Sequence, residues 1–311
     1  MYTSQQLKRR SAICFLAFVA LLVSLCSADN VYTFRPPFIE HAIAHWDYGG
    51  STTVDDSYIR LTQALESRAG WLFSREPFEY HAWAAVLEYK VGGPRSPGAD
   101  GMALWYVQHP AQGTVFGGSE KYTGLGIFFD TFDNDGRQNN PSIYAVLNDG
   151  THPFDHRHDG GSRVLGQCTA EYRNTQHPIK TKIIYMNRSI MVYFDLSNSE
   201  HWQPCFLAAD IDLTTGYYWG MTAATGYYSD NHEVMSFSVL PIEDQEFDTE
   251  YQNLDEGHVD EVTSEPPIEE TPVDERSVEQ PESRQQPPQP PPQNQTPQTQ
   301  PVAPPPPPPP Q

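Results

Sequence analysis

The chain has 311 residues, of which 40 are acidic and 19 basic, and its net charge at pH 7 is −21. An acidic surface repels the phosphates of nucleic acids and of anionic membranes, so both are poor partners for this protein. The length would allow two domains, but the composition separates only a short N-terminal segment, one central region and a Pro-rich C-terminal segment.

Residues 1–28 have the features of a secretory signal peptide. Lys8, Arg9 and Arg10 form a basic region, residues 13–25 an apolar core, and residues 26–28 a small-residue cleavage site. An uncleaved membrane anchor is the alternative, but the apolar run is short for a bilayer span. The sequence therefore predicts a protein of the secretory pathway.

The central region, residues 29–242, is predicted to be one all-β domain. Its runs of aromatic and branched residues, separated by Gly, Pro, Asn and Asp, are typical of strands. The predicted strands are residues 83–91, 102–108, 124–132, 142–148, 179–186, 190–196, 205–213, 217–225 and 234–240. The turn at Asn187-Arg188 indicates a hairpin. Many strands without helical periodicity favour two packed antiparallel sheets, a β-sandwich.

A loop rich in oxygen ligands follows the strand expected at 124–132. Its carboxylates are Asp130, Asp133 and Asp135, its amides include Asn134, Asn139 and Asn140, and Arg137 is its only basic residue. So many oxygens in one place suit a hard cation, and calcium is the best match. The alternative is a solvated turn without a metal.

A second polar segment, residues 155–161, could complete this site. Asp159 would add a fourth negative charge, so that two calcium ions would balance the set. The first loop is not an EF-hand, because Thr131 and Ser142 occupy positions that require acidic residues. A zinc site made of His152, His156 and His158 is less favoured, because their spacing is irregular and no cysteine accompanies them.

Asp100, just before the strand at 102–108, has two interpretations. It could cap a turn, or it could offer an acceptor to a ligand hydroxyl near the calcium loop.

The cysteines support an oxidising compartment. Cys14 and Cys26 leave with the signal, so Cys168 and Cys205 are the remaining pair and are predicted to form a disulfide. Two buried free thiols are the alternative. The sequons at Asn187 and Asn294 predict N-glycosylation in the same compartment.

Residues 243–311 are predicted to be a disordered, acidic tail. From Pro241 onward the chain holds 19 of its 29 prolines and 16 acidic residues against two basic ones. Such a segment buries too little apolar surface to offset its conformational entropy. It is expected to act as a spacer, or as a Pro-rich ligand for an aromatic groove.

Taken together, these motifs resemble those of the leguminous-type (L-type) lectins of the early secretory pathway. That family includes the mannose-binding cargo receptor of the ER–Golgi intermediate compartment. The resemblance covers about residues 34–242 and rests on the Cys168/Cys205 pair and four motifs. The motifs are GADGMALWY (98–106), GLGIFFDTFDNDGRQNNP (124–141), DHRHDGGS (155–162) and AATGYYSDNHEVMSF (223–237).

The resemblance implies a concanavalin-like sandwich with a calcium-dependent site for high-mannose glycans. The implied ligands are Asp130, the Phe132 carbonyl, Asn134 and Asp159 for one calcium, and Asp133, Asp135, Asn139, Asn140 and Asp159 for a second. Mannose would contact Asp100, Asn134 and His156, together with the backbone around Gly226. The Ala99–Asp100 peptide is implied to be cis.

Three departures from the family pattern affect specificity and anchoring. Ala64 stands where the cargo receptor has a sugar-contacting serine, and Gly226-Tyr227-Tyr228 replaces its Gly-Gly-Leu loop. Tyr227 could stack on a pyranose ring or block the pocket. The stalk and membrane span of the family's receptors do not follow residue 242, so either the sequence is truncated or the product is soluble in the lumen.

The leading functional hypothesis is a calcium lectin that binds high-mannose N-glycans of newly made glycoproteins and assists ER-to-Golgi transport. It would act in the lumen of the endoplasmic reticulum, the intermediate compartment and the Golgi, alone, as a homo-oligomer or with a cargo-receptor partner. The alternative is a lectin fold that has lost sugar binding and serves as a protein-interaction module. A glycoside hydrolase is disfavoured, because no Glu-x-Asp-x-x-Glu strand is found and the clustered acids suit a metal.

Overall fold

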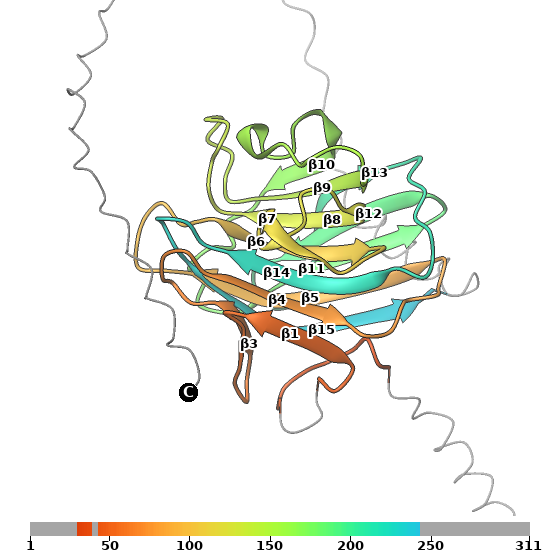
Figure 1. The fold of residues 1–311 in the computed structure, drawn as a ribbon, viewed down its shortest axis with the longest axis horizontal. Coiled ribbons are helices and arrows are strands. Elements are labelled where there is room, and N and C mark those ends of the chain that lie inside the picture. The colour runs from red at the N-terminus through yellow and green to blue at the C-terminus, as the bar shows by residue number, and fades with distance from the viewer. Residues whose placement is uncertain (1–29, 39–42, 243–311) are drawn as a thin grey trace, which may run out of the picture. The chain divides into compact units, whose positions relative to one another are not determined.

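The computed structural model describes residues 30–38 and 43–242 (Figure 1). The predicted signal, the predicted tail and the sequon at Asn294 lie outside these residues. Within the described part, no helix has both the length and the apolar character needed to cross a bilayer.

The described residues form two seven-stranded sheets, and Figure 1 shows them stacked as two layers. Every strand pair within them is antiparallel. The first sheet, in spatial order, is β1 (Trp46–Gly50), β4 (Ala69–Ser74), β14 (Tyr218–Ala224), β6 (Gly101–Val107), β8 (Thr123–Asp130), β9 (Ser142–Asp149) and β10 (Val164–Thr169). The second is β13 (Gln203–Ala208), β12 (Ser189–Asp195), β11 (Ile179–Met186), β5 (Trp83–Gly92), β15 (Asn231–Pro241), β3 (Ile59–Thr62) and β2 (Thr53–Val54).

Three short elements lie outside the two sheets: β7 (Gln112–Val115) and the 3-10 turns η1 (His156–His158) and η2 (Gly161–Arg163). The sandwich predicted from the strand pattern is therefore confirmed.

The predicted strands agree with the structure where aromatic and branched residues run without interruption. The hairpin of β11 and β12 is confirmed, and Asn187 and Arg188 both adopt positive φ in its tight turn. The prediction of one strand over 205–213 is wrong in extent, because β13 ends at Ala208 and Asp210 takes a left-handed conformation. Ile211 instead folds into the core, and its N–H donates to the Arg188 carbonyl.

Six strands escaped prediction because their sequences are short or poor in apolar residues. They are β1, β2, β3, β4, β7 and β10. Five of them lie at or next to the lateral edges of the sheets, and three of these, β1, β2 and β10, have no strand neighbour on one flank.

The two sheets enclose the main core but differ on their outer faces. In β5 every second residue is buried and the others are half-exposed, so the outer face of the second sheet meets solvent. In β6 all seven residues are buried. Its Leu104 and Tyr106 face the main core, while Ala103 and Trp105 join a second apolar cluster on the other side.

That second cluster lies beneath segments that cover the first sheet. Val115 and Phe116, from β7 and the turn after it, and Phe154 from the β9–η1 segment pack there against Phe128 and Tyr144. The burial of both faces explains why β6 and β8 read as continuous apolar runs rather than alternating ones. It also brings the segment before Asp159 onto the sheet that carries the calcium-loop candidate.

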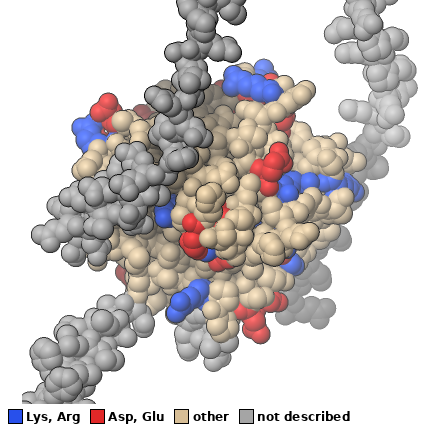
Figure 2. Space-filling model, turned by 180° about the vertical axis from the view of Figure 1, so that it is seen from behind, with Lys and Arg blue, Asp and Glu red and all other residues tan. Residues whose placement is uncertain are grey.

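Charged side chains are dispersed over the described surface. On the face seen in Figure 2, Lys and Arg lie in small separate groups with acidic residues between them. Exposed ion pairs include Arg75 with Asp47 at 2.7 Å and Arg188 with Asp212 at 3.3 Å. Exposed ion pairs of this kind each contribute about 0–1 kcal/mol to stability. The stability of the fold therefore comes mainly from the packing of apolar side chains.

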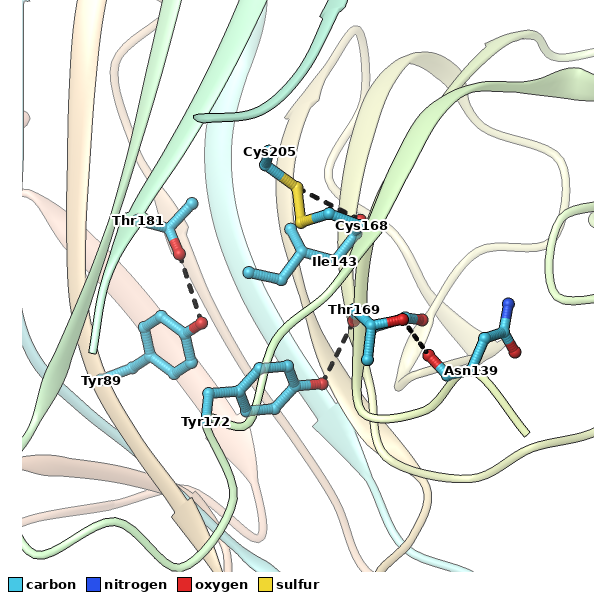
Figure 3. Close-up of a disulfide and its surroundings, with 9 residues drawn as sticks. Tyr89, Asn139, Ile143, Cys168, Thr169, Tyr172, Thr181 and Cys205 are labelled. Carbon is cyan, nitrogen blue, oxygen red and sulfur yellow. Dashed lines mark hydrogen bonds between the residues drawn. A yellow bond between two sulfur atoms is a disulfide. The ribbon is translucent and has the colours of Figure 1, made fainter. Parts of the chain in front are cut away.

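A disulfide between Cys168 and Cys205 joins the edge strands of the two sheets, as predicted (Figure 3). Cys168 lies on β10 and Cys205 on β13, and their Cα atoms are 5.2 Å apart. The neighbouring Thr169 donates a hydrogen bond from Oγ1 to the carbonyl of Asn139 at 3.0 Å, which connects this edge to the calcium-loop candidate.

Removing this disulfide should destabilise the folded region. The double variant Cys168→Ser/Cys205→Ser is expected to lose about 3–4 kcal/mol of unfolding free energy, because the bridge lowers the conformational entropy of the unfolded chain. Urea denaturation of residues 29–242 with and without reductant measures this loss. Equal unfolding midpoints for the wild type and the double variant would show that the bridge contributes nothing.

Candidate functional site

The strand pair β8 and β9 presents the predicted metal loop at one end of the first sheet. Asp130 and Ser142 form the last register pair, and residues 131–141 connect them. Asp159 approaches from η1 with φ 46, a left-handed conformation at the end of that turn. The two segments that the sequence analysis joined by charge counting are therefore adjacent.

Three of the predicted ligands gather their carboxylates. Asp133, Asp135 and Asp159 each offer one oxygen, and these oxygens lie within 4.8 Å of one another. Burial, followed by the neighbouring carboxylate of Asp135, raises the pKa of Asp159 to about 6. Like charges so close together destabilise one another unless a cation lies between them.

The backbone of the loop orients Asp133. The N–H groups of Gly136 and Gln138 donate to its two carboxylate oxygens at 2.7 and 2.8 Å. Desolvation raises the pKa of Asp133, but these donors outweigh it and lower the pKa below its ordinary value. Asp135 accepts from the Arg137 N–H at 3.0 Å and pairs with its guanidinium at 3.1 Å.

The amide of Asn134 lies against two further oxygens. One of its terminal atoms is 3.1 Å from the Phe132 carbonyl oxygen and 3.2 Å from Oδ1 of Asp159. With nitrogen in that position, the amide donates two hydrogen bonds. With oxygen there, three oxygens converge, as coordination of a cation requires.

Three buried oxygens in this cluster have no hydrogen-bond donor among the described residues. They are Oδ1 of Asn139, Oδ1 of Asn140 and Oδ2 of Asp159. Buried acceptors are rarely left without a partner, because each such group costs about 1–3 kcal/mol. All three belong to the ligand set implied for the second calcium, so the residues present fit an oxygen-preferring divalent ion.

Asp130 lies deeper than the other carboxylates and is 2% exposed. Burial, and after it the charge of Asp159, raises the pKa of Asp130 well above its ordinary value. It accepts hydrogen bonds from the Phe132 N–H at 3.0 Å and the Tyr144 hydroxyl at 3.2 Å. Tyr144 was missed by sequence reasoning, although its place on the strand paired with β8 could have indicated it.

The histidines do not assemble a zinc site. His158 contacts Asp155 at 2.9 Å, and His152 contacts Thr151. The Nε2 atom of His156 lies 3.5 Å from Thr114 and 4.0 Å from Glu120. The one acidic or His/Cys cluster of metal-binding geometry in the described residues contains no histidine.

Asp100 lies where three segments meet. Its N–H donates to the Ala224 carbonyl at the end of β14, and its carbonyl accepts from the N–H and the hydroxyl of Thr131, each at 3.1 Å. The Ala99–Asp100 peptide is cis. Burial raises the pKa of the Asp100 carboxyl to about 6. A Cβ added to Gly226 would lie 3.2 Å from Oδ1 of Asp100, so this glycine lets the two loops approach closely.

Aromatic side chains connect the Gly226 loop to the metal loop. Tyr228 stacks on Phe132 with ring centroids 6.0 Å apart, and Tyr227 meets Tyr228 edge-on at 5.3 Å. Tyr227 is 69% exposed and lies under the Arg95 guanidinium, 5.7 Å from its ring centroid. The polar and aromatic groups therefore line one end of the first sheet.

Ala64, which differs from the residue of the cargo receptor, lies close to the start of β15. Its backbone N–H donates to the side-chain oxygen of Asn231 at 2.8 Å.

Comparisons with known proteins agree with this architecture. The model of the legume-like lectin family matches residues 27–249. Protein ERGIC-53 of Homo sapiens is 31% identical over 213 residues, which cover 66% of this chain and 42% of that protein. VIP36-like protein of Homo sapiens is 34% identical over 203 residues, covering 63% of this chain and 58% of that protein. The chain thus spans only about half the length of these relatives.

Solved structures of VIP36 share the fold. The calcium-bound form of its exoplasmic/lumenal domain superposes with a TM-score of 0.66 and 31% identity, covering 71% of this chain and 94% of that one. The same domain has been solved with calcium and Man3GlcNAc, with 72% of this chain covered. The sandwich, the clustered carboxylates and the family match together show that this chain belongs to the legume-like lectin family.

Proposed function

We propose that the folded region is a calcium-dependent lectin that binds high-mannose N-glycans. The observation that carries this proposal is the set of buried, donor-free oxygens of Asn139, Asn140 and Asp159. Thr131, in the same loop as the two asparagines, donates to the Asp100 carbonyl, so that loop and Asp100 lie at the same end of the first sheet. VIP36, the structural relative, has been solved with calcium and mannose-containing ligands, which supports the same ligand class here.

The proposed sugar site uses fixed polar groups. Asp100 offers carboxylate oxygens to ligand hydroxyls, and the absence of a side chain at Gly226 leaves its backbone accessible beside them. Bound calcium supplies the positive charge that neutralises the carboxylates and favours the oxygen-inward orientation of the Asn134 amide. In that orientation the amide nitrogen of Asn134 is available to donate to a sugar hydroxyl. His156 is proposed as a further sugar contact from η1.

For the whole protein, we propose a role in carrying newly made glycoproteins from the endoplasmic reticulum to the Golgi. Such a lectin acts in the lumen of these compartments, where the N-glycans of cargo are exposed. The support is the relationship to ERGIC-53 and to the exoplasmic/lumenal domain of VIP36. Glycosylation at Asn187, which is exposed in the β11–β12 turn, fits the same compartment.

A protein-interaction module without sugar binding is the second candidate. It is favoured by Tyr227, which is 69% exposed beside the proposed pocket, and by Ala64 in place of the family's serine. If the wild type binds no mannose in calcium and Tyr227→Gly does not create binding, this candidate replaces the lectin.

The first test is calorimetric titration of residues 29–242 with a high-mannose glycan. Binding is expected in calcium and should disappear with chelator. Asn134→Ala should abolish binding, because it removes the amide that is proposed to donate to a sugar hydroxyl. The circular dichroism spectrum should stay unchanged, because Asn134 lies in an exposed loop. Gln203→Ala, which removes an exposed amide on β13, is the matched control and should bind normally. Normal glycan binding by Asn134→Ala would place the site elsewhere.

Calcium stoichiometry tests the proposed ligand sets. Titration of the wild type with calcium is expected to give two ions per chain, and Asp135→Asn one, because Asp135 belongs only to the second set. Reduced charge repulsion keeps this variant folded without metal. A single ion in the wild type would contradict the two-ion arrangement.

Glycan affinity at saturating calcium should fall as the pH decreases from about 7.5 to about 5.5. Burial raises the pKa of Asp100 to about 6, so its acceptor carboxylate is ionised above this pH and becomes neutral below it. Calorimetry of the wild type across this range measures the change, and a flat profile would contradict the proposed role of Asp100.

A further inference from the structure

A buried ion pair between Arg173 and Asp230 lies behind the proposed sugar site. Nε and Nη2 of Arg173 donate to the two oxygens of Asp230 at 2.9 and 2.8 Å. The Arg173 side chain is 13% exposed and that of Asp230 is fully buried. Such a two-pronged pair fixes both partners in position and orientation. Among the described residues, neither partner is hydrogen-bonded or ion-paired with a predicted calcium ligand.

The pair holds the loop between β5 and β6, which carries Asp100. The Arg173 guanidinium donates to the carbonyls of Arg95 and of Gly93, and the backbone N–H of Asp230 donates to the Ala99 carbonyl at 3.0 Å. A Cβ at Gly98 would lie 2.1 Å from both Nε of Arg173 and Oδ2 of Asp230. The loop therefore rests directly on the ion pair, and only a glycine fits there.

The same pair ends the loop between β14 and β15, which carries Gly226 and Tyr227. Asp230 immediately precedes β15, and its carbonyl accepts from the Thr62 hydroxyl at 3.3 Å. Arg173 is held at the end of β5 through its neighbour Asn174. The Asn174 N–H donates to the Val91 carbonyl, and the Asn174 side chain accepts from the Gly93 N–H, each at 2.9 Å. Two loops of the proposed sugar site thus share one anchor.

The neighbouring histidine leaves this anchor undisturbed at neutral pH. His232 is fully buried, and its Nδ1 lies 2.7 Å from the Thr62 hydroxyl. Burial lowers the pKa of His232 to about 4, although Asp230 acts in the opposite direction. A neutral imidazole does not compete with Arg173 for the carboxylate.

We infer that Arg173 and Asp230 are positioning residues that set the spacing of the Asp100 and Gly226 loops and so determine glycan affinity independently of calcium. This inference rests on the proposed lectin function. The calcium ligands come from the β8–β9 loop and Asp159, whereas the ion pair supports the other two loops. Loss of the pair therefore separates glycan affinity from calcium affinity, which a general loss of stability would not do.

The test compares Arg173→Lys and Asp230→Asn with the wild type in residues 29–242. Lysine keeps the charge but cannot reach two oxygens and two carbonyls with one planar group. Asparagine keeps the shape but removes the charge. Each variant is expected to lose about tenfold in glycan affinity, the equivalent of one hydrogen bond to a charged group. The calcium affinity, measured by calorimetry, should stay within about twofold, a change well below one lost ligand contact.

Arg60→Lys provides the matched control. Arg60 pairs with Glu233 at 2.7 Å on β3 and β15, with side chains 26% and 13% exposed, and contacts neither loop of the sugar site. This variant should lower the melting temperature without changing glycan affinity. Gly98→Ala is a second route to the same disturbance, because it displaces the Asp100 loop while leaving both charges in place, and it should weaken glycan binding in the same way.

The outcomes separate the two levels of the proposal. Unchanged glycan affinity in folded Arg173→Lys and Asp230→Asn, with the wild type binding normally, overturns the positioning role alone. A parallel loss of glycan and calcium affinity also overturns it, because the pair then supports the whole domain. Absence of glycan binding by the wild type in calcium overturns the proposed function, and this inference with it.

Discussion

Crowded oxygen atoms at the end of β8, several of them without a hydrogen-bond donor, are the constraint on which the proposed site depends. Asp133, Asp135 and Asp159 bring their carboxylates together, while Asn139 and Asn140 add buried carbonyl oxygens that no donor satisfies. In water such a cluster repels itself, and burial strengthens the repulsion. A bound divalent cation would make the same arrangement favourable, and the conformation of the loop would then be coupled to metal binding.

The sandwich makes this cluster possible by covering the first sheet on both faces. The main core lies on one side, and the aromatic cluster around Trp105 and Phe128 on the other. Tyr144 extends from that cluster to Asp130, and Thr169 beside the disulfide reaches the backbone of Asn139. The metal loop is thus attached at both ends to rigid packing, which is what precise coordination requires of its scaffold.

Two different kinds of interaction hold the loops at this end of the molecule. The β8–β9 loop carries the carboxylates of the proposed metal site, whereas the Asp100 and Gly226 loops rest on an internal ion pair that is complete without a cation. Stacking of Tyr228 on Phe132 and the hydrogen bonds from Thr131 to Asp100 connect the two systems. A ligand at their junction would therefore sense both calcium and the spacing of the loops.

The sequence by itself determined the elements whose chemistry is local. Uninterrupted apolar runs indicated β6, β8 and β9, the Asn187-Arg188 turn indicated a hairpin, and the density of Asp and Asn indicated a cation. The resemblance of several motifs added the ligand sets and the fold family. Edge strands such as β1 and β10 were not predicted, because their stability comes from a neighbouring strand rather than from their own pattern.

Only the tertiary structure decided which distant residues meet. Arg173, Asp230 and Gly98 lie far apart in the sequence, and no spacing rule connects them. Tyr144 supports Asp130 because two strands pair in one register, and Asp159 joins Asp133 because a covering segment packs on an aromatic cluster. The sequence shows which charged and polar groups need a partner. Which partner each one meets depends on how the strands pair and the sheets stack.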